Sequence, residues 1–154
     1  NQHWLQRFMT EPHIEESSEL KAELAQLQCK YPNITTCDVL IQSLHTLDIA
    51  NDILFYSACN NLHVIVMLCI QSRLNIEAKN NNGYTALLGA AYNGHDNVIK
   101  VLLESGANIE AKENNDRTAL IVAAIKGHDN VIKVLLESGA NIEAKQDNGR
   151  TALI

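Results

Sequence analysis

The sequence predicts an all-α solenoid, in which short helical repeats stack in a row. The first observation is a duplicated block, because residues 94–112 and residues 127–145 have the identical sequence GHDNVIKVLLESGANIEAK. The second is the spacing of the copies, since position 94 recurs at position 127, and a period of about 33 residues is typical of repeat proteins. The third is the helical spacing of the apolar residues inside each copy. A unit this small buries its apolar face only against neighbouring units, so we expect a stack.

Each repeat is predicted to contain two helices joined by a glycine turn. In the repeat at 83–115, Thr85 precedes a short apolar segment, and its hydroxyl can cap a first helix that runs to about Asn93. Gly94 suits the left-handed turn that follows, and Asp96 can cap the second helix. The second helix has one apolar face, formed by Val98, Ile99, Leu102 and Leu103.

A polar stretch follows the second helix. Gly106 ends that helix, and residues 107–115 are polar and too short for another one. We expect them to leave the stack as an extended finger. The finger should turn back at Asn-Gly dipeptides such as 82–83 and 148–149, which favour tight turns. The repeat at 116–148 has the same parts in the same order.

This arrangement of helix, turn, helix and projecting finger resembles the ankyrin repeat. The matching residues lie at 83–87, 90–91, 94–95, 98–103 and 106–111, each with a partner at the same place in the next copy. The resemblance covers about residues 49–154 and implies an ankyrin-repeat solenoid that serves as a protein-binding scaffold. One departure is the sequence Thr-Ala-Leu at the start of each first helix, where the family usually has Thr-Pro-Leu-His.

Two incomplete repeats flank the two good copies. Residues 50–82 form a degenerate repeat, in which Asn61 and Arg73 replace turn glycines. A left-handed arginine costs about 1–2 kcal/mol, so we expect the turn at Arg73 to differ. The second helix of this repeat is apolar all round, even at Met67, and must be covered on more than one side. Residues 149–154 begin a further repeat as an unpartnered half helix, so we expect a fragment of a longer protein.

The N-terminal segment, residues 1–49, shows three helical patterns. The apolar residues of these patterns are Trp4, Leu5, Phe8 and Met9 before Pro12, then Leu20, Leu24 and Leu27 within 16–30, then Leu40, Leu44 and Leu47 after Thr35 or Thr36. Terminal repeats need an outer face that tolerates water, so we expect this segment to be a helical cap on the stack. The alternative is that it ends an unrelated upstream domain.

Composition and motifs argue against several functions. The net charge of −6 disfavours nucleic acid, and the longest apolar run, residues 64–70, is too short to span a membrane. The four cysteines form no C-x-x-C pair, and Cys59 and Cys69 lie in apolar helical stretches where a free cysteine behaves as a small hydrophobic residue. We therefore expect reduced thiols and a cytoplasmic setting. No phosphate-binding, nucleophile or zinc-protease motif occurs. We therefore predict no enzyme activity, no catalytic or metal-binding residue, no cofactor and no small-molecule substrate. A nucleophile pair of Cys59 and His63 is disfavoured, since His63 lies at a turn.

Differences between the two good copies suggest where a partner binds. All differences lie outside the identical block, at the paired positions 83/116, 84/117, 88/121, 89/122, 92/125, 93/126, 113/146 and 114/147. These positions fall on the finger tips and first helices, which in the ankyrin family line a concave groove that binds protein partners. Adaptation of this surface to a binding partner explains the clustering. Random drift together with packing constraints explains it as well.

The predicted partner-binding residues come from this groove. They are Tyr84, Tyr92, Asn93, Lys112, Glu113, Arg117, Ile125, Lys126, Lys145 and Arg150. The groove carries a basic excess, with Lys79, Lys112, Arg117, Lys126, Lys145 and Arg150 against Glu113, Asp116 and Asp147. This excess favours a protein partner with an acidic surface, and a merely solvated charged face is the alternative. A second possible function is a targeting or substrate-recruiting arm of a larger enzyme or effector.

Overall fold

The computed structural model describes residues 18–44 and 47–153, in which it has helices and turns and no strand. This confirms the all-α prediction. The pattern around Trp4 lies outside the described residues. The helices are α2 (Ser18–Lys30), α3 (Cys37–Leu44), α4 (Leu47–Cys59), α5 (His63–Gln71), α6 (Ala86–Asn93), α7 (Asp96–Glu104), α8 (Ala119–Lys126) and α9 (Asp129–Glu137).

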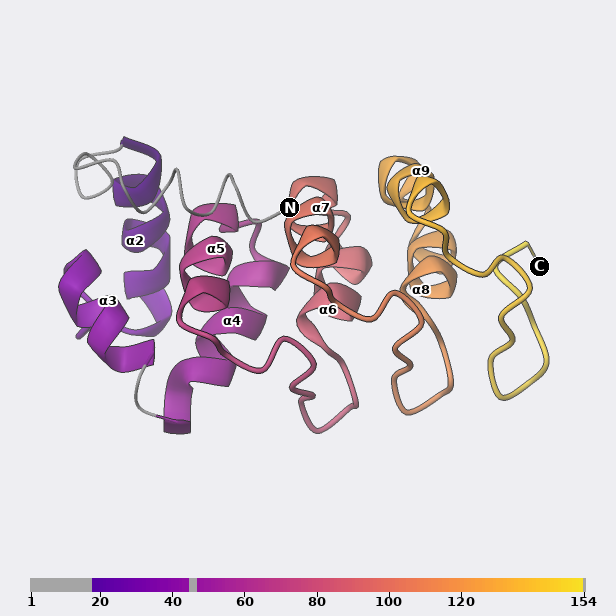
Figure 1. The fold of residues 1–154 in the computed structure, drawn as a ribbon, viewed down its shortest axis with the longest axis horizontal. Helices are drawn as coiled ribbons and strands as arrows, with labels where there is room; N and C mark the ends of the chain where they lie inside the picture. The colour runs from indigo at the N-terminus through magenta and orange to yellow at the C-terminus, as the bar shows by residue number, and fades with distance from the viewer. Residues whose placement is uncertain (1–17, 45–46, 154) are drawn as a thin grey trace.

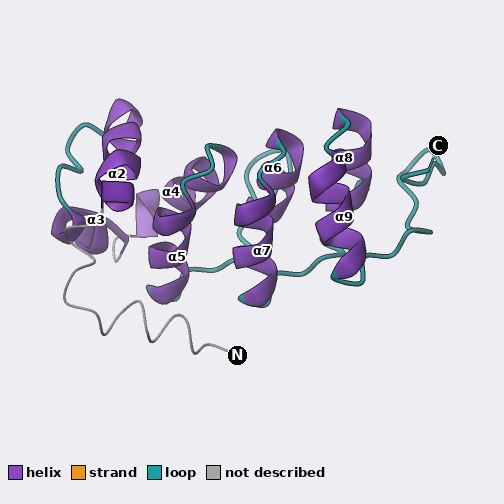
Figure 2. Ribbon diagram, turned by 90° about the horizontal axis from the view of Figure 1, so that it is seen from above, coloured by secondary structure: helices purple, strands orange, loops and turns teal. Residues whose placement is uncertain are grey.

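The helices from α4 to α9 form three antiparallel pairs stacked in a row (Figures 1 and 2). The first helices of the pairs pack in the order α4, α6, α8, and the second helices in the order α5, α7, α9. A polar finger follows each second helix and projects on the side of the first helices (Figure 1). The structure is therefore the solenoid that the period of the sequence predicts.

The ends of the first helices follow from single residues. The Thr85 hydroxyl accepts a hydrogen bond from the Leu88 N–H at 3.4 Å, which confirms the predicted cap. Gly94 ends α6 with a φ of 78°, in the left-handed region where a Cβ is disfavoured. The prediction for Asp96 is wrong, because it lies inside α7 and the N-cap residue is His95, which makes no side-chain cap bond.

The His95 side chain joins neighbouring pairs instead. Its Nε2–H donates to the Cys59 carbonyl at 2.8 Å, and His128 makes the same bond to the Tyr92 carbonyl at 2.9 Å. A carbonyl oxygen only accepts, so Nε2 carries the proton in both rings. This supports the interpretation of the two histidines as structural turn residues.

The degenerate repeat keeps the turns of the good copies. Asn61 and Arg73 both have a φ of 59°, so the expectation of a different turn at Arg73 is wrong. The Arg73 N–H donates to the Ile70 carbonyl at 3.0 Å, as the Gly106 N–H donates to Leu103 at 3.1 Å. Packing of the flanking helices and these bonds outweigh the local cost of about 1–2 kcal/mol.

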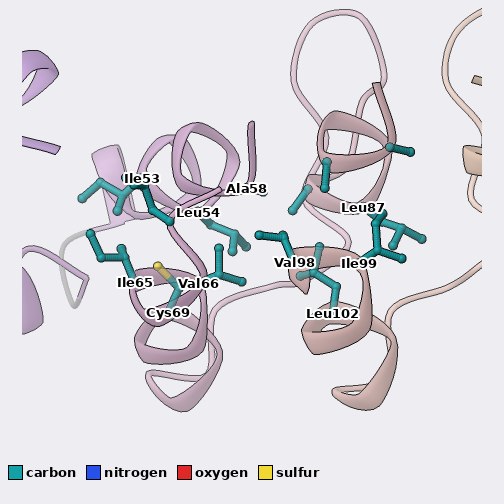
Figure 3. Close-up of a cluster of buried hydrophobic side chains, with 14 of the residues drawn as sticks. Ile53, Leu54, Ala58, Ile65, Val66, Cys69, Leu87, Val98, Ile99 and Leu102 are labelled. Carbon is teal, nitrogen blue, oxygen red and sulfur yellow. The ribbon is translucent and has the colours of Figure 1, made fainter. Parts of the chain in front are cut away.

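The core lies within and between the helix pairs. Figure 3 shows side chains of α4 and α5, among them Leu54 and Val66, facing those of α6 and α7, among them Val98. Equivalent leucines of the two good copies are buried, with exposures of 2% for Leu87 and Leu120 and 0% for Leu102 and Leu135.

The N-terminal helices cover the far end of the stack. Leu20, Leu24 and Leu27 of α2 are buried, and α2 contacts α5 while α3 contacts α4. The apolar α5 thus lies between α2 and α7, which confirms that it is buried on more than one side. Leu47, predicted to share a helix with Leu40 and Leu44, begins α4 instead.

The C-terminal end differs from the predicted half helix. Ala152 and Leu153 form a turn, and the Leu153 side chain is 73% exposed. Among the described residues, no helix combines the length and apolar character that crossing a membrane requires.

Candidate partner-binding surface

Three pockets follow one another between the finger tips and the first helices. The first, of about 330 Å³, includes Phe55, Asn80, Tyr84 and Tyr92. The middle pocket, of about 260 Å³, is lined by Tyr84, Tyr92, Arg117, Val122, Ile125 and Lys126. The third, of about 150 Å³, includes Ile121, Ile125, Gln146 and Arg150. Neighbouring pockets share residues, so we treat them together and call this row of three pockets the groove.

The middle pocket brings together five of the predicted binding residues. The rings of Tyr84 and Tyr92 meet edge to face, with centroids 6.2 Å apart. The Lys126 ammonium lies 4.1 Å from the centroid of the Tyr92 ring, a cation–π contact. Tyr92 and Ile125 leave 42% and 57% of their surfaces exposed. The pocket therefore presents aromatic and aliphatic surface beside a positive charge.

The two tyrosine hydroxyls have opposite pKa shifts. Burial raises the pKa of Tyr84 above its ordinary value. The neighbouring Lys126 ammonium lowers the pKa of Tyr92, because a cation stabilises the phenolate. A tyrosine hydroxyl can donate a hydrogen bond to a partner and also accept one.

Glu113 is an internal anchor of the finger and only 4% exposed. Its Oε1 and Oε2 accept from the Nε and Nη2 of Arg117 at 3.0 and 3.1 Å, a two-bond ion pair. The carboxylate also accepts from both the backbone and side-chain nitrogens of Asn115, each at 3.0 Å. Burial raises the pKa of Glu113, but the bonds from Arg117 and Asn115 outweigh it and hold the pKa below its ordinary value. Sequence reasoning placed Glu113 on the partner surface, whereas the structure uses it to fix the finger tip.

The predicted lysines of the fingers lie outside the three pockets. The Lys79 ammonium donates to the Lys112 carbonyl at 2.9 Å, and the Lys112 ammonium donates to the Lys145 carbonyl at 3.3 Å. Two glutamates make a parallel ladder, since Glu77 and Glu110 accept from backbone N–H groups of the next finger at 2.7 Å. These side chains join successive fingers. Both ladders could have been predicted from the repeat period of the sequence, because they join residues about one repeat apart.

The remaining predicted residues lie at the two ends of the groove. Asn93 lines the first pocket, where its Nδ2 donates to the Gly89 carbonyl at 2.8 Å. Arg150 lines the third pocket together with Ile125. Of the ten predicted residues, only Lys112, Glu113 and Lys145 line none of the three pockets.

The positions that differ between the good copies gather in the groove. Tyr84 and Arg117 line it, as do Gly89 and Val122, and the pair Tyr92 and Ile125. No residue of the identical blocks lines any of the three pockets. Sequence variation between the copies is therefore concentrated where the surface is hollowed.

Cys59 also lines the first pocket. Burial raises the pKa of its thiol to about 11, so it is protonated at neutral pH and a poor nucleophile. Among the side chains that the structure describes, no three of His, Cys, Asp or Glu gather as metal ligands.

Comparison with known families identifies the repeats. The family model for ankyrin repeats (three copies) matches residues 25–113 and 110–154, and so begins before residue 49, where the resemblance was expected to start. No curated protein matches the chain. The match, the helix pairs and the projecting fingers agree, and the chain belongs to the ankyrin-repeat family.

Proposed function

We propose that this chain is a scaffold that binds a protein partner through the groove. The observation that carries the proposal is the middle pocket, where Tyr84, Tyr92, Arg117, Ile125 and Lys126 meet. Ankyrin repeats are generally protein–protein interaction modules and are typically non-catalytic. Tyrosine and arginine are the side chains that most often dominate the energy of protein interfaces.

The groove also has a rigid support. The histidine bonds between pairs and the two ladders between fingers hold the pocket walls in place. A pre-formed surface loses little conformational freedom on binding, and more of the contact energy is then retained as affinity. The same groove serves the second candidate, a recruiting arm of a larger enzyme or effector, because either role begins with capture of a protein.

We also propose that α2 and α3, within the segment 1–49, cap the first repeat. The Glu23 carboxylate of α2 accepts from the Val64 N–H at 3.2 Å and the Ile65 N–H at 2.9 Å, which satisfies the start of α5. Glu23→Ala should lower the unfolding free energy by about 1–3 kcal/mol, because two buried donors lose their acceptor. Gln26→Ala is the control, since Gln26 lies on the same helix and is exposed. Equal effects of the two changes would oppose the cap.

A cytoplasmic location is part of the same proposal. Cys29, Cys59 and Cys69 are free thiols, as expected in a reducing compartment. Burial raises the pKa of both Cys59 and Cys69, which protects these thiols from oxidation.

The binding proposal is tested without knowledge of the natural partner. A random peptide library is selected on the purified chain, and the affinity of enriched peptides is measured by fluorescence anisotropy. Tyr92→Ala should weaken binding by at least about tenfold, because an aromatic anchor in an interface contributes more than about 1.4 kcal/mol. Leu136→Ala is a matched control, since Tyr92 and Leu136 are each 42% exposed but Leu136 lies on α9, outside the pockets. Peptides that bind both variants equally, or that respond only to Leu136→Ala, would refute the groove.

Charge reversal at Arg117 is a poor test of the same idea. Arg117→Glu would place a second carboxylate against the buried Glu113 and disturb the finger itself. Lys126→Glu avoids this problem, and Lys133→Glu on α9 changes the net charge equally at another exposed site.

A further inference from the structure

The cations of the groove are not equivalent. Arg117 is closed on Glu113 by two hydrogen bonds, and that carboxylate has only 1% of its side chain exposed. The pair is therefore nearly neutral toward a partner. Counting Arg117 among the attractive charges, as the sequence suggested, overstates its contribution.

The next repeat lacks this neutralisation. The positions of Glu113 and Arg117 correspond, one repeat further along the chain, to Gln146 and Arg150. The Gln146 amide donates to the Asn148 Oδ1 at 2.7 Å and carries no charge. In the part of the chain that the structure describes, no carboxylate forms an ion pair with Arg150. One change, from glutamate to glutamine, thus leaves a guanidinium with its full charge at the third pocket.

Lys126 provides a second uncompensated charge nearby. Its ammonium rests over the Tyr92 ring, and none of the ion pairs within residues 18–44 and 47–153 involves it. Ile125 is 57% exposed and lines both the middle pocket, with Lys126, and the third pocket, with Arg150. An exposed aliphatic side chain is therefore bordered by two cations that form no ion pair with a carboxylate in the described part of the chain.

The opposite end of the groove is neutral. The first pocket is lined by Phe55, Cys59, Asn80, Asn82, Tyr84, Gly89, Tyr92 and Asn93, which include no charged side chain. A bound segment therefore meets apolar and amide groups at one end and positive charge at the other.

The geometry points to an extended acidic peptide segment as the partner of this groove. One large apolar side chain fills the first pocket, and carboxylates of aspartate or glutamate reach Lys126 and Arg150. Neighbouring repeats lie about 8–10 Å apart, and an extended chain advances about 3.3 Å per residue, so each repeat corresponds to about three residues. The apolar anchor and the acidic end are then about six residues apart, since the first and third pockets are separated by two repeats. This inference rests on the proposed function and adds the chemistry of the ligand.

The peptides selected on the purified chain provide the probe. We expect them to combine a large apolar residue with glutamate or aspartate at that spacing. In an enriched peptide, replacement of the acidic residue by its amide should weaken binding by about tenfold, the loss of one charge-assisted bond. Arg150→Gln should weaken the acidic peptide similarly and leave the amide peptide unchanged, because the two changes remove the same contact. Lys133→Gln on α9 removes an equal charge from the exposed surface and is the control.

The outcomes separate this inference from the proposed function. Enriched peptides without acidic residues, or additive effects of Arg150→Gln and the amide replacement, overturn the acidic ligand. If Tyr92→Ala still weakens those peptides, binding in the groove stands. Equal losses from Arg150→Gln and Lys133→Gln indicate net charge alone and also overturn the inference. If Tyr92→Ala has no effect, the groove itself is wrong and both proposals fail.

Discussion

Two glycines at equivalent positions, each followed by the same sequence, provide a test of how neighbouring repeats are joined. Gly94 and Gly127 end α6 and α8 with φ values of 78° and 74°. A Cβ added at Gly94 would lie 2.7 Å from Nδ1 of His128, whereas one at Gly127 meets no atom within 4 Å. Both alanine variants pay about 1–2 kcal/mol for the left-handed backbone. Only Gly94→Ala must also displace the His128 ring.

The extra cost can be worked from one hydrogen bond. A displaced ring loses its 2.9 Å bond to the Tyr92 carbonyl, which contributes about 0.5–1.5 kcal/mol. We therefore expect Gly94→Ala to lower the unfolding free energy by about 1.5–3.5 kcal/mol, and Gly127→Ala by about 1–2 kcal/mol. Urea unfolding followed by circular dichroism measures both values. In a His128→Ala background the difference should vanish. A difference that persists there would show that His128 does not carry the contact.

Three further outcomes are expected. Leu120→Ala should cost about 2–5 kcal/mol, since the side chain is 2% exposed and its removal leaves a cavity; an unchanged urea midpoint would contradict the placement of α8. Glu113→Gln should cost about 2–4 kcal/mol by leaving Arg117 without its carboxylate. The folded pKa of Glu113 is lowered, so this contribution is present above the ordinary glutamate pKa and fades below about pH 4; equal acid sensitivity of wild type and variant would oppose it. Alkaline titration followed by ultraviolet absorption, with Tyr92→Phe to assign the signal, should show a higher Tyr92 pKa in Lys126→Met than in the wild type. An unchanged Tyr92 pKa would show that the Lys126 ammonium does not act on this hydroxyl.

The period of the sequence was sufficient to predict the repeats. Thr85, Gly94 and Gly106 each require a local geometry that hardly depends on the rest of the chain, and the structure has it at all three. Arg73 shows the limit of local reasoning. Its backbone penalty is real, but the contacts of two packed helices exceed it, and a sequence pattern does not reveal that balance.

The candidate site could be predicted only in part. Comparison of the two good copies located the groove residues. Equivalent positions of successive repeats line up along the stack, so the positions that differ between the copies lie together on one side of it. It could not separate Arg117 from Arg150, since both are arginines in the same register. Whether each is neutralised depends on a side chain four residues earlier, Glu113 in one finger and Gln146 in the other, and on how that side chain folds back.

The residues that bond one repeat to the next are largely different from the residues that line the groove. Several bonds between repeats come from positions that do not vary between the copies, such as His95 and His128 or the Lys79 and Lys112 ladder. The pockets are lined largely by positions that do vary. Substitution in the groove therefore changes what the surface contacts while the bonds that hold the stack remain. Two structural contacts do lie at variable positions. The Glu113–Arg117 pair fixes a finger, and the Asn114 side chain donates to the Asn81 carbonyl of the neighbouring finger at 3.2 Å. The next repeat has Gln146 in place of the glutamate, so Arg150 has no such partner while both ladders remain, and the charge of the groove differs between the two repeats.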